Sequence, residues 1–247
     1  SVESQKGVGT TMWFVLNLKK GKQSDLPEKV IIEIDSDFLK DKKILIAADN
    51  EMNRLVASIF LQNYGAEIIN AVTGRQAVEE CELKKPDVIL MDIQMPLMNG
   101  FEATKMIRQI GNNIPIIALT ANAIKGENEK CIAAGMNDYV SKPFKEEELL
   151  KKIARLIGKE IKLITVEEDA PVVTSTALYD LSSLKAISRG NDAFVEKMVN
   201  VFCDQTPPML EELKNAWYAN ELEKMGAIAH KIKPSIDNLK ITSLQQV

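Results

Sequence analysis

Histidine is almost absent from this sequence, since the 247 residues contain only His230. A metal site built on several histidines is therefore excluded, and a Ser-His-Asp triad would have to use this one residue. No GxSxG motif, which marks the nucleophile of many hydrolases, accompanies it. The scarcity of histidine argues against these hydrolytic sites.

Cysteine is scarce as well. Cys81, Cys131 and Cys203 are odd in number, far apart and without CxxC spacing. This usage argues against a disulfide framework or a zinc site and is typical of a reducing compartment. We expect three small, buried, reduced side chains.

The sequence also lacks a strong excess of charge of one sign. Its 31 basic and 35 acidic side chains give a net charge of −4, so no nucleic-acid partner is expected. No apolar run approaches the roughly 18 residues of a membrane-spanning helix, and the N-terminus lacks the layout of a signal peptide. We expect a soluble, cytoplasmic stretch of chain.

A regular alternation of short apolar runs and amphipathic segments begins near Lys43. Apolar spacing predicts strands at residues 44–48, 67–71, 87–92, 115–119 and 138–141, and helices at 50–63, 74–84, 100–110, 123–134 and 145–157. Five β-α units in series predict an α/β fold: a doubly wound, flavodoxin-like, five-stranded parallel sheet with helices on both faces.

Four polar residues stand at the ends of predicted strands. Asp49 follows the first strand, Asp92 ends the third, Thr120 follows the fourth and Lys142 follows the fifth. Ligands of doubly wound sheets bind outside the carboxyl ends of the strands, so we expect these side chains at one edge. Two converging carboxylates repel unless a cation joins them, and hard oxygen ligands suit Mg²⁺.

The same four residues are chemically suited to a phosphoryl group. Lys142 supplies a positive charge for one phosphoryl oxygen, and the Thr120 hydroxyl a hydrogen bond to another. Mg²⁺ would screen the negative charge of the incoming group. Asp92 is then the natural nucleophile, which predicts an aspartyl phosphate.

Over residues 42–158 this pattern resembles response-regulator receiver domains. The resemblance rests on Asp49, Met91-Asp92 with Met95-Pro96, Ala118-Leu119-Thr120-Ala121, and Tyr139-Val140-Ser141-Lys142-Pro143-Phe144. It implies that Asp92 is the phosphoacceptor, and that Asp49, Asp92 and the backbone carbonyl of Gln94 bind Mg²⁺. It also implies a switch pair of Thr120 and Tyr139, and a cis peptide between Lys142 and Pro143.

One position departs from the receiver pattern. Receivers usually carry two adjacent acids after the first strand, and here the first of them is Ala48. Losing a charge near the cation costs up to about 4 kcal/mol at ~4 Å with an effective dielectric of ~20, and less through a water layer. We therefore expect weakened Mg²⁺ binding.

Two other functions stand against a phosphorylated receiver. The alternative is a degenerate receiver that acts as a protein-interaction module. A phosphatase of the haloacid dehalogenase type is disfavoured, because Gln94 stands where that family has its second acid.

The N-terminal residues carry a second resemblance. Gly7-Val8-Gly9-Thr10-Thr11, followed by an apolar run at 12–18, resembles the last glycine box and final strand of the ATP-binding domain of histidine kinases. Without the rest of that domain, residues 1–20 would be a remnant that cannot bind ATP. The alternative is an edge strand that pairs with residues 29–34 across a polar turn. Residues 21–41 are predicted as a linker with a strand.

The pattern changes after Gly158. Residues 166–171 are acidic and residues 172–176 are polar and β-branched, which predicts an interdomain linker over residues 159–177. Residues 178–247 show helical spacing only, with helices predicted at 181–188, 192–205, 207–218 and from about 221. This predicts a small antiparallel helical bundle.

His230 lies on the last of these helices. The buried stripe of that helix is predicted from apolar residues at alternating spacings of three and four: Leu222, Met225, Ala229, Ile232, Ile236 and Leu239. His230 falls outside the stripe, Gly226 leaves it uncovered, and Lys233 offers a cation one turn later. An unburied imidazole is nucleophilic near neutral pH, and a solvated surface histidine is the alternative.

Residues 229–233, Ala-His-Lys-Ile-Lys, are similar to histidine phosphotransfer domains. The similarity implies that His230 is a phosphoacceptor and Lys233 its supporting cation. Pro234 predicts a kink or break in the helix. The family's bundle also needs more helix after this point, so we expect the open apolar face to be covered by a second copy of the chain, by a domain swap or by the N-terminal segment.

Together these resemblances imply the C-terminal part of a hybrid two-component sensor histidine kinase. Phosphoryl groups would pass from the kinase domain of the parent protein to Asp92, exchange with His230 and reach a separate downstream receiver. Phosphoryl transfer is the only enzymatic activity expected, because the ATP site is missing. The parent protein would be membrane-anchored.

Overall fold

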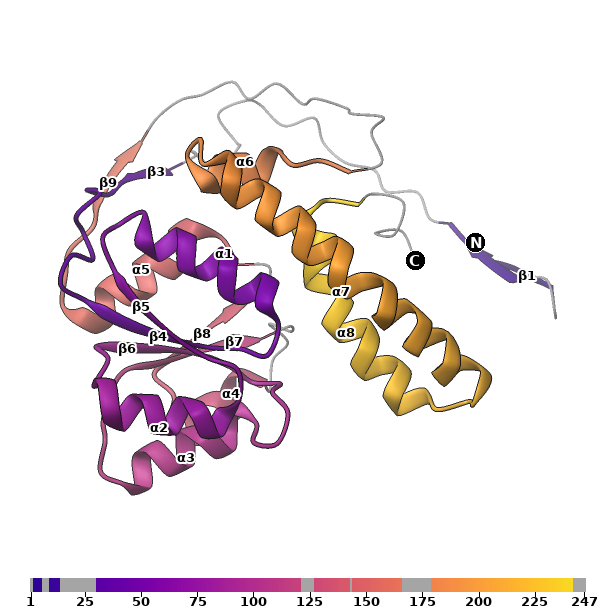
Figure 1. Ribbon diagram of the computed structural model, residues 1–247, viewed down its shortest axis with the longest axis horizontal. Coiled ribbons are helices and arrows are strands. Elements are labelled where there is room, and N and C mark those ends of the chain that lie inside the picture. Colours follow the sequence, from indigo (N-terminus) through magenta and orange to yellow (C-terminus); the bar gives the residue numbers. More distant parts are fainter. Residues whose placement is uncertain are drawn as a thin grey trace. The chain divides into compact units, whose positions relative to one another are not determined.

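The structure is a computed structural model that describes residues 2–5, 9–13, 30–120, 127–142, 144–165 and 179–241. The chain divides into two compact units. One comprises Ser1–Ile31 with Leu163–Ala170, and the other Ile32–Lys162 with Pro171–Val247. The second unit holds the large sheet and the C-terminal helices (Figure 1).

Short strands flank the central sheet at the N-terminal side of the sequence. β1 (Val2–Gln5) pairs antiparallel with β2 (Gly9–Met12), and residues 14–18 of the predicted strand lie outside the described residues. Among the described residues, β3 (Val30–Glu33) pairs with β9 (Lys162–Thr165), and residue 29 of the predicted partner strand also lies outside them. β9 lies inside the segment that the sequence predicts as a linker.

The central sheet is the predicted one. Its strands are all parallel, in the order β5 (Glu67–Ala71), β4 (Lys43–Ala47), β6 (Val88–Asp92), β7 (Ile116–Thr120) and β8 (Asp138–Ser141). This is the flavodoxin-like order, whose direction of winding reverses between β4 and β6. The prediction of a doubly wound fold is confirmed, and β4 and β6 are the strands that lead into Asp49 and Asp92.

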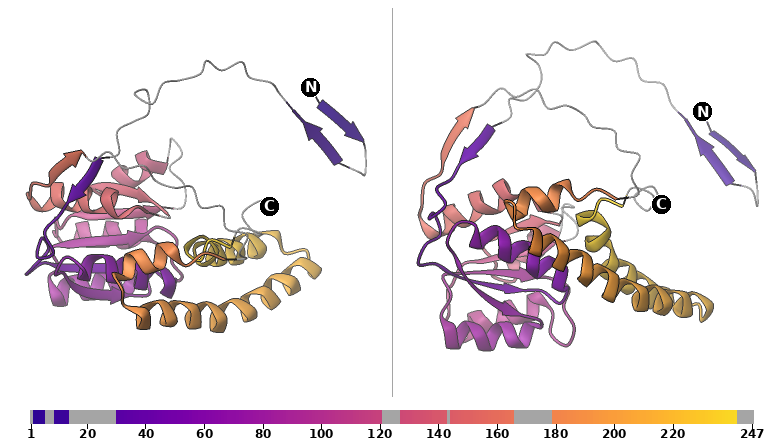
Figure 2. Two further views of the ribbon diagram at one scale, coloured as in Figure 1. Left: turned by 90° about the horizontal axis from the view of Figure 1, so that it is seen from above. Right: turned by 45° about the horizontal axis from the view of Figure 1, so that its top comes forward.

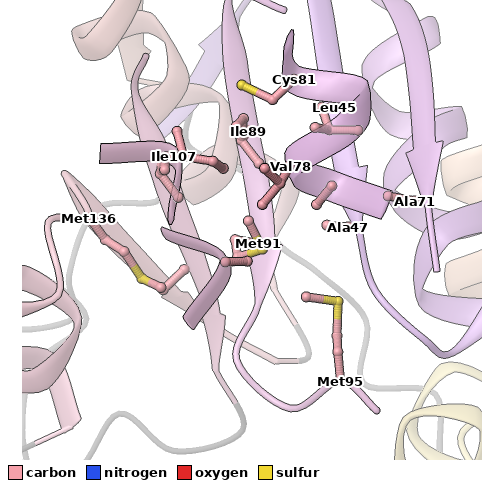
Figure 3. Close-up of a cluster of buried hydrophobic side chains, with 14 of the residues drawn as sticks. Leu45, Ala47, Ala71, Val78, Cys81, Ile89, Met91, Met95, Ile107 and Met136 are labelled. Carbon is pink, nitrogen blue, oxygen red and sulfur yellow. The ribbon is translucent and has the colours of Figure 1, made fainter. Parts of the chain in front are cut away.

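Helices cover both faces of this sheet. α1 (Glu51–Gln62) and α5 (Glu146–Ile157) lie on one face, and α2 (Gly74–Lys84), α3 (Gly100–Gln109) and α4 (Glu127–Ala133) on the other (Figure 1). Residues 123–126 of the predicted fourth helix lie outside the described residues. Alternate residues of each strand enter opposite cores: Leu45 and Ile89 pack against α2 and α3 (Figure 3), whereas Ile46 and Leu90 pack against α1 and α5.

The C-terminal part contains α6 (Ser182–Ser188), α7 (Asp192–Tyr218) and α8 (Leu222–Asn238), and α7 and α8 form a hairpin of adjacent helices (Figure 2). A new helix at residue 207 is a wrong prediction, because α7 continues through Pro207 and Pro208. Proline has no backbone N–H, so the carbonyls of Cys203 and Asp204 lose their helical hydrogen-bond donors. Both residues are exposed, so water can bond to these carbonyls instead. The predicted break at Pro234 is also absent, since α8 continues to Asn238.

Two burial predictions for this part need correction. Ile228 is buried in α8, whereas the predicted stripe residues Ala229 and Leu222 are exposed. At this turn of α8 the buried residue is Ile228, one position before the predicted Ala229. Cys203 is exposed, while Cys81 and Cys131 are buried as expected.

The helical hairpin packs against α1 of the α/β domain. We call the shared apolar core the docking cluster; its buried members are Met52, Val56, Phe60, Leu184, Phe194, Val195, Met198 and Leu239. A second, smaller cluster lies within the hairpin around Ala216, Ile228 and Ile232. Helix α1 therefore covers part of the apolar face of the C-terminal helices. The sequence did not predict this contact.

Close backbone packing positions the loop after β6. The Asn99 side chain accepts a hydrogen bond from the Glu102 N–H, and Glu102 accepts one from the Asn99 N–H, both at 2.9 Å, which begins α3 with a capping box. A Cβ on Gly100 would lie 2.2 Å from the carbonyl oxygen of Asp92. Any side chain at position 100 must therefore displace the backbone of Asp92.

Replacing Gly100 with alanine is expected to destabilise the protein by about 1–3 kcal/mol, because the added methyl overpacks a backbone contact. Gly226→Ala is the matched control. A Cβ there meets nothing within 4 Å, and alanine within a helix should stabilise by about 0.5–1 kcal/mol. Urea unfolding of both variants checks this, and equal stability of Gly100→Ala and wild type would contradict it.

Candidate functional site

Asp92 ends β6 as a buried carboxylate with two polar partners. Its Oδ2 accepts a hydrogen bond from the Lys142 Nζ at 2.6 Å, and its Oδ1 accepts one from the Gln94 N–H at 3.1 Å. The side chains of Asp92 and Lys142 are 3% and 8% exposed. Burial raises the pKa of Asp92, Lys142 and the Gln94 N–H lower it, and the charge of Asp49 raises it again. Asp92 and Lys142 form a buried ion pair.

A cavity of about 500 Å³ opens at the carboxyl ends of β4 and β6. Asp49, Asp92, Gln94 and Lys142 line it. The structure thus brings together four of the residues that the sequence selected. The Lys142–Pro143 peptide cannot be compared with its prediction, because Pro143 lies outside the described residues.

Thr120 and Tyr139 lie at the edge of this site. Thr120 ends β7 with a side chain 1% exposed, and its carbonyl accepts a hydrogen bond from the Lys142 N–H at 2.6 Å. Tyr139 lies on the adjacent strand, two residues before the register partner of Thr120. Among the described residues, neither belongs to the cavity lining. Their role as a switch stays a prediction.

The oxygen donors at this edge of the sheet fit a divalent cation. The described residues contain no cluster of three or more acidic, histidine or cysteine ligands, so a metal would have to combine two carboxylates with a backbone carbonyl. Asp49 and Asp92 lie in one cavity, and the charge of Asp49 raises the pKa of Asp92. A cation between them would relieve that repulsion, and these oxygen ligands fit Mg²⁺.

The helix α8 closes one side of this cavity. Ala227, His230, Lys231 and Pro234 line it together with Asp92. The Asn50 side chain donates a hydrogen bond to the Lys231 carbonyl at 2.9 Å, and the Lys231 Nζ lies 3.8 Å from the Asp49 Oδ2. His230 is therefore held at the cavity that Asp92 also lines, by contacts to the residue that follows it.

Further contacts join α6 and α7 to the two ends of α1. At its beginning, the Gln205 side chain donates to the Glu51 carboxylate at 2.7 Å. At its end, the Asn63 side chain donates to the Ile187 carbonyl at 2.8 Å, and the Arg189 guanidinium lies 4.7 Å from the ring centre of Tyr64. These polar contacts flank the docking cluster and fix the register of α6 and α7 on α1.

The environment of His230 favours its neutral form. Burial lowers the pKa of His230 from its usual 6.5, and the charges of Lys142 and Lys233 lower it further, whereas Asp92 and Asp49 raise it. The net shift is downward. A neutral imidazole is the nucleophilic form, so the site keeps His230 reactive.

His230 is expected to titrate below pH 6.5 in the full chain. The docked state has the lower pKa and the undocked state binds the proton more readily, so docking should weaken as pH falls below 6.5 and be unaffected above it. Because the chain has one histidine, its imidazole proton signal in NMR reports this pKa directly. A midpoint at or above 6.5 would contradict the expected burial.

The sequence missed Asn50 and Lys231 as site residues. In the structure Asn50 caps the start of α1, since its side chain accepts a hydrogen bond from the Asn53 N–H at 3.0 Å. Its second contact joins residues 181 positions apart in sequence. No local pattern reports such a contact.

The fold and site define an α/β domain with a buried Asp–Lys pair at the switch point of a parallel sheet. The family model for the response regulator receiver domain matches residues 44–154. This part of the chain is a response regulator receiver domain. Its class of function is phosphorelay signalling in two-component systems.

The curated relatives are histidine kinases. The chain is 41% identical over 140 residues to hybrid signal transduction histidine kinase I of Dictyostelium discoideum, a match that covers 53% of this chain and 8% of that protein. It is 29% identical over 197 residues to the signal transduction histidine-protein kinase BarA of Escherichia coli K12, covering 78% of this chain and 22% of that protein. The chain therefore spans less than a quarter of either relative.

A solved receiver domain is similar to part of this chain. The receiver domain of sensor histidine kinase PA1611 from Pseudomonas aeruginosa PAO1, crystallised with a magnesium ion in its active-site cleft, is 43% identical. The match has a TM-score of 0.45 and covers 48% of this chain and 98% of that chain.

Among the described residues of our chain, no helix is both long and apolar enough to cross a membrane.

Proposed function

We propose that Asp92 accepts a phosphoryl group with the help of Mg²⁺ and exchanges it with His230 of the same chain. The observation that carries this proposal is that Asp92 and His230 line one cavity. The proposal assigns residues 42–158 to the receiver and residues 178–247 to a shortened phosphotransfer module. Residues 1–20 would be a kinase remnant, with linkers at 21–41 and 159–177.

The chemistry at Asp92 follows from its partners. The Gln94 N–H and the Lys142 ammonium hold the two carboxylate oxygens in fixed positions. When one oxygen attacks the phosphorus of a donor, the bond from phosphorus to the donor breaks and the donor leaves with its electron pair. Lys142 is then free to neutralise a phosphoryl oxygen instead of the carboxylate.

The residues that would hold Mg²⁺ are Asp49, Asp92 and the Gln94 carbonyl. When bound, the ion would neutralise negative charge on the phosphoryl oxygens. Ala48 is fully buried and offers no oxygen ligand from its side chain. The affinity is therefore expected to be lower than with a second acid.

An Ala48→Asp variant is expected to bind Mg²⁺ more tightly than the wild type, because it adds one carboxylate beside the cation. Calorimetric titration in equal ionic strength measures both affinities. Leu97→Asp, at a side chain that is 95% exposed, controls for an added charge. Equal affinities in wild type and Ala48→Asp would remove the claim.

The step to His230 would take place in the cavity that both residues line. His230 is held at the cavity by the Asn50 and Asp49 contacts to Lys231. Its neutral imidazole would attack the phosphorus of the aspartyl phosphate, which returns Asp92 to a carboxylate. The reverse step uses the same geometry.

Partners outside this chain follow from the relay and from the relatives named above. A kinase domain of the parent protein would supply the phosphoryl group, and a separate receiver would accept it. Because α8 lines one side of the cavity, an external histidine would have to enter it from another side or displace α8.

Phosphosite mapping tests the proposal. Acetyl phosphate with Mg²⁺ should modify Asp92 in the wild type, and a share of the phosphoryl group should appear on His230. The variant His230→Gln should carry phosphate on Asp92 alone, and Asp92→Asn should carry none. Absence of any modification of Asp92 would favour the alternative, a degenerate receiver used for protein interaction, which the buried Ala48 motivates.

A further inference from the structure

A second cavity adjoins the first. Its volume is about 300 Å³, and its walls come from α1, the β8–α5 connection, α6 and α8. His230 and Lys142 line both cavities. His230 therefore separates the Asp92 cavity from a second space that the phosphoryl chemistry above does not use.

Lysines outnumber carboxylates in the lining of the second cavity. Lys142, Lys145, Lys233 and Lys240 line it, against one carboxylate, Asp237. Two of these lysines are already engaged, Lys142 with Asp92 at 2.6 Å and Lys240 with Asp180 at 3.2 Å. Within the part of the chain that the structure describes, Lys145 and Lys233 have no ion-pair partner. The excess positive charge is thus available to a ligand.

Neutral groups complete the cavity. Ser183 and Asn238 offer a hydroxyl and an amide as hydrogen-bond donors, while Phe60 and Phe144, with ring centres 6.0 Å apart, form part of its apolar wall. A small, partly enclosed site with several cations and neutral donors suits a compact anion with several oxygens. A planar or extended apolar ligand would leave the lysines unpaired.

We infer that this second cavity binds a phosphoryl dianion. Two sources share that chemistry: the phosphoryl group on His230 itself, or a free phosphate. In the first case, which rests on the proposed function, Lys145 of the receiver would stabilise phosphohistidine across the interface, and phosphorylation would strengthen docking of α8. In the second case, a free phosphate would occupy the site whether or not phosphoryl transfer occurs.

The first arm of the test uses inorganic phosphate and the unphosphorylated full chain. Titration at constant ionic strength, followed by amide NMR, should shift signals of Lys145, Ser183 and Asn238. Lys145→Met should weaken binding about threefold to tenfold, since one exposed cation is lost. The control Lys151→Met removes an exposed lysine of α5 outside the cavity and should leave the affinity unchanged.

The second arm uses phosphoramidate, which modifies histidine directly, on the full-length Asp92→Asn variant. The ³¹P signal of phosphohistidine should shift when Lys145→Met is added and stay unchanged with Lys151→Met. A response in only one arm assigns the anion to that source. No response in either arm, or an equal response to both lysine variants, would overturn the inference. The free-phosphate arm does not depend on phosphoryl transfer to His230, so it can support the inference even if that transfer fails.

Discussion

Replacing Lys142 with methionine is expected to cost about 3–5 kcal/mol of unfolding free energy at neutral pH without Mg²⁺, because it leaves Asp92 as an unpaired buried charge. The two side chains are 8% and 3% exposed and 2.6 Å apart. Phosphorylation of Asp92 by acetyl phosphate should also slow about 100-fold or more, since a charge that stabilises the transferring group is lost. Urea unfolding and a phosphorylation time course measure the two effects.

The pH dependence of this variant follows from the same pair. Lys142 is the main group that lowers the pKa of Asp92 against the effect of burial. Without it the folded-state pKa of Asp92 lies further above the unfolded value, so the folded state binds a proton more readily. The destabilisation is then present at high pH and is lost as pH falls through the raised pKa of Asp92.

Two controls separate the buried pair from a simple loss of lysine. Lys142→Met combined with Asp92→Asn removes both charges and should recover most of the lost stability. Lys40→Met breaks an exposed pair with Asp37, at 3.5 Å, and should change stability by less than about 0.5 kcal/mol. A double variant as unstable as the single one would contradict the ion-pair explanation.

Replacing Val56 with glutamate is expected to detach the helical hairpin from the receiver. Val56 is 5% exposed within the docking cluster, and burying an unpaired carboxylate there costs several kcal/mol. Hydrogen exchange should therefore speed up across α7 and α8 while the central sheet keeps its protection. The pKa of His230 should rise toward 6.5, because burial is the largest cause of its lowering.

Val72→Glu is the matched control, since Val72 is 45% exposed and lies outside the docking cluster. It makes the same chemical change and should leave the exchange of α7 and α8 unchanged. Unfolding of the sheet by Val56→Glu, or unaltered protection of the hairpin, would each contradict the docking account.

The fold of the receiver was predictable because its signals are local. Period-two alternation separates the two cores, so that Leu45 and Ile46 enter opposite faces. In a doubly wound sheet the ligand site lies at the carboxyl ends of the strands, and this rule alone predicts that Asp49, Asp92 and Lys142 lie together. The end of α7 was mistaken for a separate helix because Pro207 is also a signal for a helix start.

The juxtaposition of His230 and Asp92 was not predictable from local patterns. Each was identified as an acceptor on its own, but the contact between their domains depends on a second apolar face of α1. Ala57 and Leu61 pack on the sheet, whereas Met52, Val56 and Phe60 pack on the hairpin. The sequence shows one broad apolar helix, and only the partner surface reveals that it has two faces.

The most direct test of the account is a mixing experiment with two full-length variants, Asp92→Asn and His230→Gln. In the wild type, the phosphoryl group should pass from Asp92 to His230 with a first-order rate that is independent of protein concentration, because both residues line one cavity of one chain. A mixture of the variants, in which only transfer between molecules remains, should show little phosphohistidine at low concentration. Transfer in the mixture as fast as in the wild type would contradict exchange within the chain.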